Sequence, residues 1–213
     1  MTSIFRKSIL TAHITFSVGW LGAVAAFLAL ALAGLRSQDV QIVPVAYPAM
    51  EQVARFVIVP LAFAALLSGI IQSLSTPWGL FRHTWILVKL LLTIFSTLVL
   101  LKKMSLIHYA AHLAGSLTSF LNADFHFAGI QLVIHAAGGM LVLFAITILS
   151  VFKPWGLTRY GQRKLQERST TPQPQYKNAS EPMRINIVLA ILGTLVVVAI
   201  ALHLAGHPFH HTH

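Results

Sequence analysis

Long apolar stretches, separated by short groups of basic residues and prolines, dominate this sequence. The first, residues 8–35, contains no charged side chain. It exceeds the roughly 20 residues that an α-helix needs to cross a bilayer, and it is longer than the apolar part of a signal peptide, about 7–15 residues. We therefore expect a retained membrane helix at the start of the chain and further spans after it.

The overall composition agrees with a membrane protein. The chain of 213 residues is 56% hydrophobic and 9% charged, which lies far from the balance of a soluble domain. Its net charge of +10 comes from lysines and arginines between the apolar stretches, so a lipid-facing cytoplasmic surface explains it better than nucleic-acid binding. We expect a multi-pass protein of a bacterial inner membrane. Its expected partners are the lipid bilayer and a larger membrane complex or a quinone, and no nucleic acid.

A short motif occurs twice and constrains the topology. Residues 77–82 read Pro-Trp-Gly-Leu-Phe-Arg and residues 154–159 read Pro-Trp-Gly-Leu-Thr-Arg, and each copy closes an apolar stretch. Proline and glycine end helices, tryptophan favours the membrane boundary, and arginine favours the cytoplasmic side. If both copies lie on one face, an even number of crossings separates them.

The sequence predicts an all-α polytopic membrane protein, a bundle of about five transmembrane helices with a cytoplasmic N-terminus and an outside C-terminus. Residues 1–152 are expected to form a four-span bundle, with spans near residues 9–35, 53–74, 84–101 and 127–152. A polar connection that includes Pro44 and Pro48 is expected between the first two spans. We also weigh a duplication of the first two spans as the next two, but little beyond the motif aligns.

The stretch after Lys102 and Lys103 allows more than one interpretation. Residues 104–123 are uncharged and moderately apolar, but a further crossing would put the two motif copies on opposite faces. We expect an outer interfacial helix near residues 104–120, or an extension of the third span. Either arrangement places the two lysines outside, against the positive-inside rule.

The last third of the chain is expected to contain three segments. Residues 153–184 carry the strongest cytoplasmic signal and are expected to form a basic linker, because lysine and arginine gather in cytoplasmic loops. Residues 185–206 are expected to form a fifth transmembrane helix. Residues 207–213 form a His-rich tail that could bind copper or zinc weakly without an evolved role.

Histidines inside the predicted spans are the main candidates for chemistry. The chain has no cysteine, so any metal chemistry must use its 11 histidines. A histidine within a membrane is costly unless it has a partner, and His13, His135 and His203 qualify. His135 and His203 differ in expected depth by roughly one helical turn, which a haem b standing along the bilayer normal could bridge. His112 or His13 could substitute for either ligand.

The surroundings of His135 allow two interpretations. Gln131, His135, Gly138 and Gly139 stand at i−4, i, i+3 and i+4, so they share one helix face. Two glycines remove side chains that would block a flat macrocycle. They equally permit close helix packing without a cofactor, and we keep both interpretations.

His108 and His112 could form a separate metal site. Their i, i+4 spacing suits two ligands of one copper or zinc ion, because imidazole binds both metals. It does not suit two axial ligands of one haem, which approach the iron from opposite sides. The alternative is a pair of solvated histidines on an interfacial helix.

The first three spans resemble a known group. His13 is followed by Val-Gly-Trp-Leu-Gly at residues 18–22, and Gly-Leu-Phe-Arg at residues 79–82 leads into an apolar helix with an early lysine, Lys89. This pattern resembles the bacterial copper-resistance D membrane domain and a related group of uncharacterised multi-span proteins. The chain is also similar in outline to small bacterial cytochromes b561, in which histidines on a helical bundle hold haem b. It departs from them by its fifth span and by having no second histidine in the first two spans.

These features lead to one main hypothesis and two alternatives. The main hypothesis is a haem b-binding membrane electron-transfer protein with bis-histidine ligation, in which His135 and His203 hold the iron. The alternatives are a cofactor-free accessory helical subunit of a respiratory or photosynthetic complex, and a copper uptake or handling protein. The sequence contains no recognisable catalytic residues, and the question of enzymatic activity stays open.

Overall fold

The computed structural model describes residues 3–37, 39, 41–75, 83–115 and 123–152, together with Gly156, Thr158 and Arg163. The regular elements in this part of the chain are all helices: α1 (Ser3–Arg36), α2 (Val43–Val53), η1 (Ala54–Ile58), α3 (Val59–Ser75), α4 (Thr84–Ala114) and α5 (Ala123–Phe152). The element η1 is a π-helical turn that joins α2 and α3 into one rod. The described residues therefore form four long rods.

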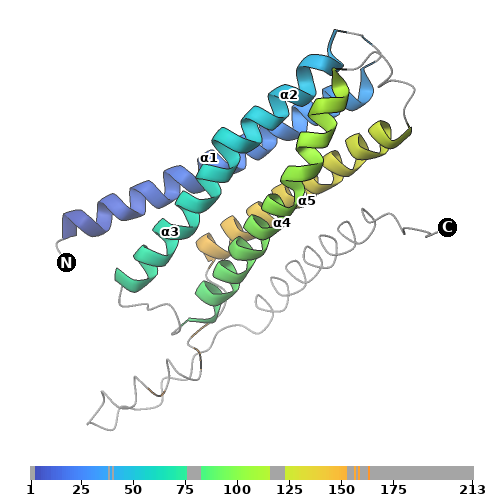
Figure 1. The fold of residues 1–213 in the computed structure, drawn as a ribbon. Helices are drawn as coiled ribbons and strands as arrows, with labels where there is room; N and C mark the ends of the chain where they lie inside the picture. The colour runs from blue at the N-terminus through green and yellow to red at the C-terminus, as the bar shows by residue number, and fades with distance from the viewer. Residues whose placement is uncertain are drawn as a thin grey trace, which may run out of the picture.

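The four rods pack as an up-and-down bundle (Figure 1). Helix α1 packs against α2, α3 and α5, and α4 packs against the same three helices, so α1 and α4 occupy diagonal corners. In Figure 1 the start of α1, the end of α3, the start of α4 and the end of α5 lie at one end of the bundle. Successive rods thus run in opposite directions.

Four segments are long and apolar enough to cross a membrane: Ile4–Arg36, Val43–Leu74, Thr84–Ala114 and Asp124–Phe152. Large apolar side chains such as Val18, Phe56, Leu91 and Phe144 point outward from these helices. An outer surface of this kind suits contact with the hydrocarbon core of a bilayer. The protein is therefore a helical membrane protein.

The two copies of the repeated motif flank the same end of the bundle. The backbone N–H of Thr84, just after the first copy, donates a hydrogen bond to the carbonyl oxygen of Gly156, within the second copy, at 3.5 Å. We call this end, which includes Thr84 and Gly156, the motif end, and the opposite end, which includes Arg36 and Ala114, the far end. Two rods separate the two copies, as the sequence predicts. Apart from Gly156 and Thr158, the residues of both motif copies lie outside the described residues.

The connection between the first two rods is shorter than the sequence suggests. We expected Pro44 and Pro48 in a polar connection, but both lie in α2, which begins at Val43. Pro44 falls in the first helical turn, where proline is tolerated because its missing N–H has no intrahelical partner. Pro48 removes one hydrogen bond. The neighbouring side chains of Tyr47 and Met50 are buried in the bundle, and this burial, about 1.5–3 kcal/mol for a large side chain, outweighs the loss.

The π-helical turn η1 has a cause in the sequence. Pro60 follows it, and the ring of a proline in a helix clashes with the carbonyl group four residues earlier, here that of Phe56. The N–H of Val59 bonds the carbonyl oxygen of Ala54 instead, five residues back, which widens the helix at this point. The widened turn carries Ile58, which is buried and faces the centre of the bundle.

Helix α4 decides between the two arrangements expected for the stretch after the two lysines. Residues 104–114 continue α4 without a break, as an extension of the third span and not as a separate interfacial helix. Lys102 and Lys103 therefore lie inside a long apolar helix, about three turns before its end. Residues 116–122, the remainder of the predicted interfacial helix, lie outside the described residues. So do nearly all of the linker at 153–184, the fifth span at 185–206 and the tail at 207–213.

Candidate functional site

His135 projects from α5 toward the centre of the bundle. It lies about three helical turns after the start of α5. Its Nδ1–H donates a hydrogen bond to the carbonyl oxygen of Gln131, one turn earlier on the same helix, at 2.7 Å. A neutral imidazole that donates from Nδ1 carries its lone pair on Nε2. This Nε2 atom is buried, so the nitrogen able to act as a ligand faces the interior.

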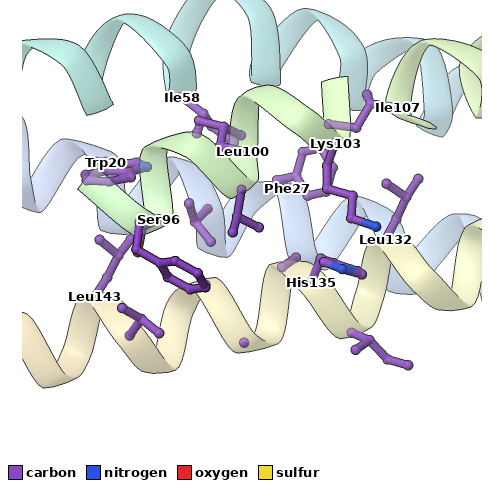
Figure 2. Close-up of a pocket in the computed structure, with 18 residues that line it drawn as sticks. Trp20, Phe27, Ile58, Ser96, Leu100, Lys103, Ile107, Leu132, His135 and Leu143 are labelled. Carbon is purple, nitrogen blue, oxygen red and sulfur yellow. The ribbon is translucent and has the colours of Figure 1, made fainter. Parts of the chain in front are cut away.

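A half-open cavity of about 110 Å³ lies beside His135, between α1, η1, α4 and α5 (Figure 2). Its aromatic walls include Trp20 and Phe27 of α1 and Phe95 of α4. Most of the remaining lining is aliphatic. Besides the indole of Trp20, the polar side chains of the lining are Ser96, Lys103 and His135. The cavity is therefore an apolar site with one imidazole and one amine.

Gly138 and Gly139 line the same cavity as His135. A methyl group added to Gly139 would meet no heavy atom within 4 Å. Within the part of the chain that the structure describes, no neighbouring helix therefore fills the space beside this glycine. A glycine required for close helix packing would have a neighbouring helix against it. For Gly139, the observation therefore favours space for a cofactor over close helix packing.

Lys103 is the cavity residue that sequence reasoning missed. It is half-buried and lines the cavity, whereas the adjacent Lys102 is exposed. Figure 2 shows the side chains of Lys103 from α4 and His135 from α5 pointing into the same space. The sequence feature that could have indicated this role was a lysine within a long apolar stretch. We read the adjacent pair as the end of a span, which hid the difference between the two side chains.

His13 occupies a different site, in the half of the bundle nearer the motif end. Its Nδ1–H is shared between the carbonyl oxygen of Ala65 and the hydroxyl oxygen of Ser68 on α3, each at 3.1 Å. The Ser68 hydroxyl itself donates to the carbonyl oxygen of Ala64 at 2.6 Å. A methyl group added to Gly69 would lie 3.0 Å from Cε1 of His13. The ring is thus bonded and tightly packed between α1 and α3.

Lys89 of α4 lies near enough to His13 for its charge to act on the imidazole. The ammonium of Lys89 also sits over the ring of Trp85, with Nζ 5.6 Å from the ring centroid. His13 and Lys89 are the two polar residues that carry the family resemblance in the sequence. The fold brings them into one region, although they are 76 positions apart in the chain.

His108 and His112 lie on the last two turns of α4, at the far end of the bundle. Their ring centroids are 6.2 Å apart, and both side chains are exposed. The Nδ1–H of His108 donates to a carboxylate oxygen of Glu51 on α2 at 2.8 Å. Within the part of the chain that the structure describes, no group of three or more histidine and acidic side chains is arranged to hold a metal ion.

The structure does not bring the three described candidate haem ligands together. His135 lines the cavity, but His13 and His112 do not. His112 lies in the last turn of α4, nine residues and therefore roughly 14 Å along this helix from Lys103, which lines the cavity with His135. His203, the expected partner of His135, lies outside the described residues. The chain matches no protein-family model, no curated protein and no solved structure.

Proposed function

We propose that the protein is a haem b-binding membrane electron carrier in which Nε2 of His135 is an axial ligand of the iron. The observation that carries this proposal is the hydrogen bond from Nδ1–H of His135 to the Gln131 carbonyl oxygen at 2.7 Å. Histidines that bind metals generally donate their second ring N–H to a carbonyl or carboxylate, which orients the ring and makes the other nitrogen a better ligand. His135 already has this orientation.

The walls around His135 suit an aromatic macrocycle. Trp20, Phe27 and Phe95 supply aromatic surface, and the open space beside Gly139 leaves room next to the imidazole. The cavity of about 110 Å³ is smaller than cofactor sites of about 300–1,000 Å³. Haem binding therefore requires α4 and α5 to separate on this side. Gly138 and Gly139 favour such a movement because they present no side chain that would have to be repacked.

For the second ligand we propose His203, whose depth in the predicted fifth span matches that of His135 within about one helical turn. His13 is a poorer candidate because its ring is bonded to Ala65 and Ser68 and packed against Gly69. Two histidines would complete the coordination of the iron. A haem held in this way transfers electrons and has no open position for oxygen.

The test is an absorption spectrum of the protein purified after expression with sufficient haem. We expect a Soret band and a reduced-minus-oxidised spectrum of haem b, both lost in His135→Gly. Adding free imidazole to His135→Gly should restore the spectrum, because the small ligand can replace the missing side chain. His112→Ala is the control and should keep the spectrum. Wild-type protein without a Soret band would end the haem proposal.

We further propose that the motif end faces the cytoplasm of a bacterial inner membrane and that residues 185–206 add a fifth span. Lys7 in the first turns of α1 and Arg163 near the end of the described chain support this orientation through the positive-inside rule. The chain lacks cysteine, so single cysteines can be labelled without background. Gln41→Cys at the far end should react with an impermeant maleimide in intact cells. Thr158→Cys should react only after the membrane is permeabilised, and the reverse pattern would contradict the orientation.

A further inference from the structure

Lys103, which is half-buried, presents an amine to the half-open apolar cavity. It lies about three helical turns from the far end of α4. A lysine near the end of a membrane helix usually extends its ammonium to the headgroup region. Lys103 instead lines the cavity, and its neighbour Lys102 takes the exposed side of the helix. The position of the Lys103 amine therefore needs a reason.

An ammonium group in an apolar environment is costly unless an anion accompanies it. None of the described residues that line the cavity is a carboxylate. The other polar side chains in the lining are the imidazole of His135, the hydroxyl of Ser96 and the indole of Trp20. None of them carries the negative charge that would balance an ammonium. Among the described residues, the cavity lining thus supplies a cation without a counter-ion.

We infer that Lys103 binds the carboxylate of a ligand that fills this cavity, a ligand with a negative charge on a large apolar body. The apolar walls contact the body of the ligand, and the ammonium forms a charge-assisted hydrogen bond with the carboxylate. Two molecules share this chemistry. One is haem b, whose propionate group would supply the carboxylate, and this alternative rests on the proposed function. The other is a long-chain fatty acid from the bilayer.

The first experiment compares haemin with haemin dimethyl ester, which lacks the propionate charges but keeps the iron. Full-length protein in nanodiscs is titrated with each compound, and the Soret band is followed. Wild-type protein should bind haemin about 10- to 100-fold more tightly than the ester, the range expected for the loss of one hydrogen bond that involves a charged group. Lys103→Met should bind both compounds equally. Lys103→Arg should keep the preference for haemin.

The control for this experiment is Lys102→Met, which removes the same charge from the adjacent, exposed position of α4. It should discriminate between haemin and its ester as the wild type does. Circular dichroism of all variants checks that helix content is retained. Because each variant is judged by its ratio of two affinities, a general loss of binding caused by altered packing does not imitate the expected result.

The second experiment tests the fatty-acid source through Trp20, which lines the cavity and is only 4% exposed. Bromine atoms quench tryptophan fluorescence at short range, so 9,10-dibromostearic acid in the nanodisc should quench Trp20 if it enters the cavity. The quenching that is lost in Trp20→Phe is assigned to this site. This site-specific quenching should be stronger for the brominated acid than for its methyl ester. In Lys103→Met the acid and the ester should quench Trp20 equally.

The outcomes separate the two proposals. If no Soret band forms but quenching by the brominated acid depends on Lys103, the haem proposal fails and the carboxylate site stands with a fatty acid as its ligand. If haemin binds through His135 and neither ligand distinguishes Lys103→Met from Lys102→Met, the carboxylate site is overturned and the haem proposal stands. If neither ligand binds the wild-type protein, both proposals are overturned.

Discussion

His13 and His135 are both histidines inside apolar helices, yet one is packed between two helices and the other borders a cavity. The ring of His13 bonds Ala65 and Ser68 on another helix and is packed against Gly69. The ring of His135 bonds a carbonyl group of its own helix and borders a cavity. In both, Nδ1 lies within hydrogen-bond distance of a carbonyl oxygen. What surrounds the rest of the ring therefore decides whether the histidine joins two helices or is available to a ligand.

Each histidine belongs to a region that also contains a lysine of α4. Lys89 acts electrostatically on His13, and Lys103 lines the cavity with His135. The two lysines are separated by roughly 21 Å along the helix at about 1.5 Å per residue. The region around His13 is closed by side chains, so its histidine stabilises the packing of α1 on α3. The region around His135 is open, so its histidine can take part in binding.

The largest expected difference in stability is between the alanine variants of the two histidines. His13→Ala removes a hydrogen bond between helices, worth about 0.5–1.5 kcal/mol, and leaves a packing defect, so we expect a loss of about 2 kcal/mol. His135→Ala should cost less than about 1 kcal/mol, because the Gln131 carbonyl keeps its backbone partner within the helix. Unfolding of both variants by SDS in mixed micelles measures the difference. Equal losses would remove the distinction between the two sites.

A smaller difference is expected between the neighbouring glycines. Gly69→Ala places a methyl group 3.0 Å from Cε1 of His13, and the resulting shift of the ring should cost about 1 kcal/mol. Gly139→Ala meets open space and should stabilise the helix slightly, by up to about 1 kcal/mol, because alanine favours helices over glycine. Thermal unfolding followed by circular dichroism compares the two. A destabilised Gly139→Ala protein would show that the space beside Gly139 is filled.

The smallest effect is expected from two serines. Ser68 is buried and bonds His13, whereas Ser96 lines the cavity. Ser68→Ala should lower stability by about 0.5–1.5 kcal/mol, the net value of one hydrogen bond. Ser96→Ala should leave stability unchanged within about 0.5 kcal/mol. A double-mutant cycle of Ser68→Ala with His13→Ala should show coupling of about 0.5 kcal/mol or more. Additive effects would argue against a direct bond.

Sequence reasoning located the helices better than their ends. Apolar length predicts the spans that begin near Thr84 and end at Phe152, and the structure confirms both boundaries. It fails at Pro44 and Pro48 because buried neighbours stabilise a helix that local propensity disfavours. It also left open whether the third span continues past the two lysines, since the pattern alone did not show that one helix carries Lys102 outward and Lys103 inward.

The candidate site was predictable only in part. The spacing of His135, Gly138 and Gly139 places them on one helix face, and the structure shows that all three line one cavity. The aromatic walls contributed by α1 were not predicted, because contacts between distant helices depend on their lateral order. The same is true of the bond from His13 to Ser68, which joins residues 55 positions apart.

The sequence by itself determined that this chain forms long apolar helices suited to a membrane. This follows from the length and polarity of its segments, which are local properties of the chain. Only the tertiary structure decided that Lys103, and not Lys102, lines the cavity beside His135. Adjacent residues on a helix point about 100° apart, so the rotation of α4 against its neighbours selects which lysine enters the cavity. That rotation is set by side-chain packing across the whole bundle.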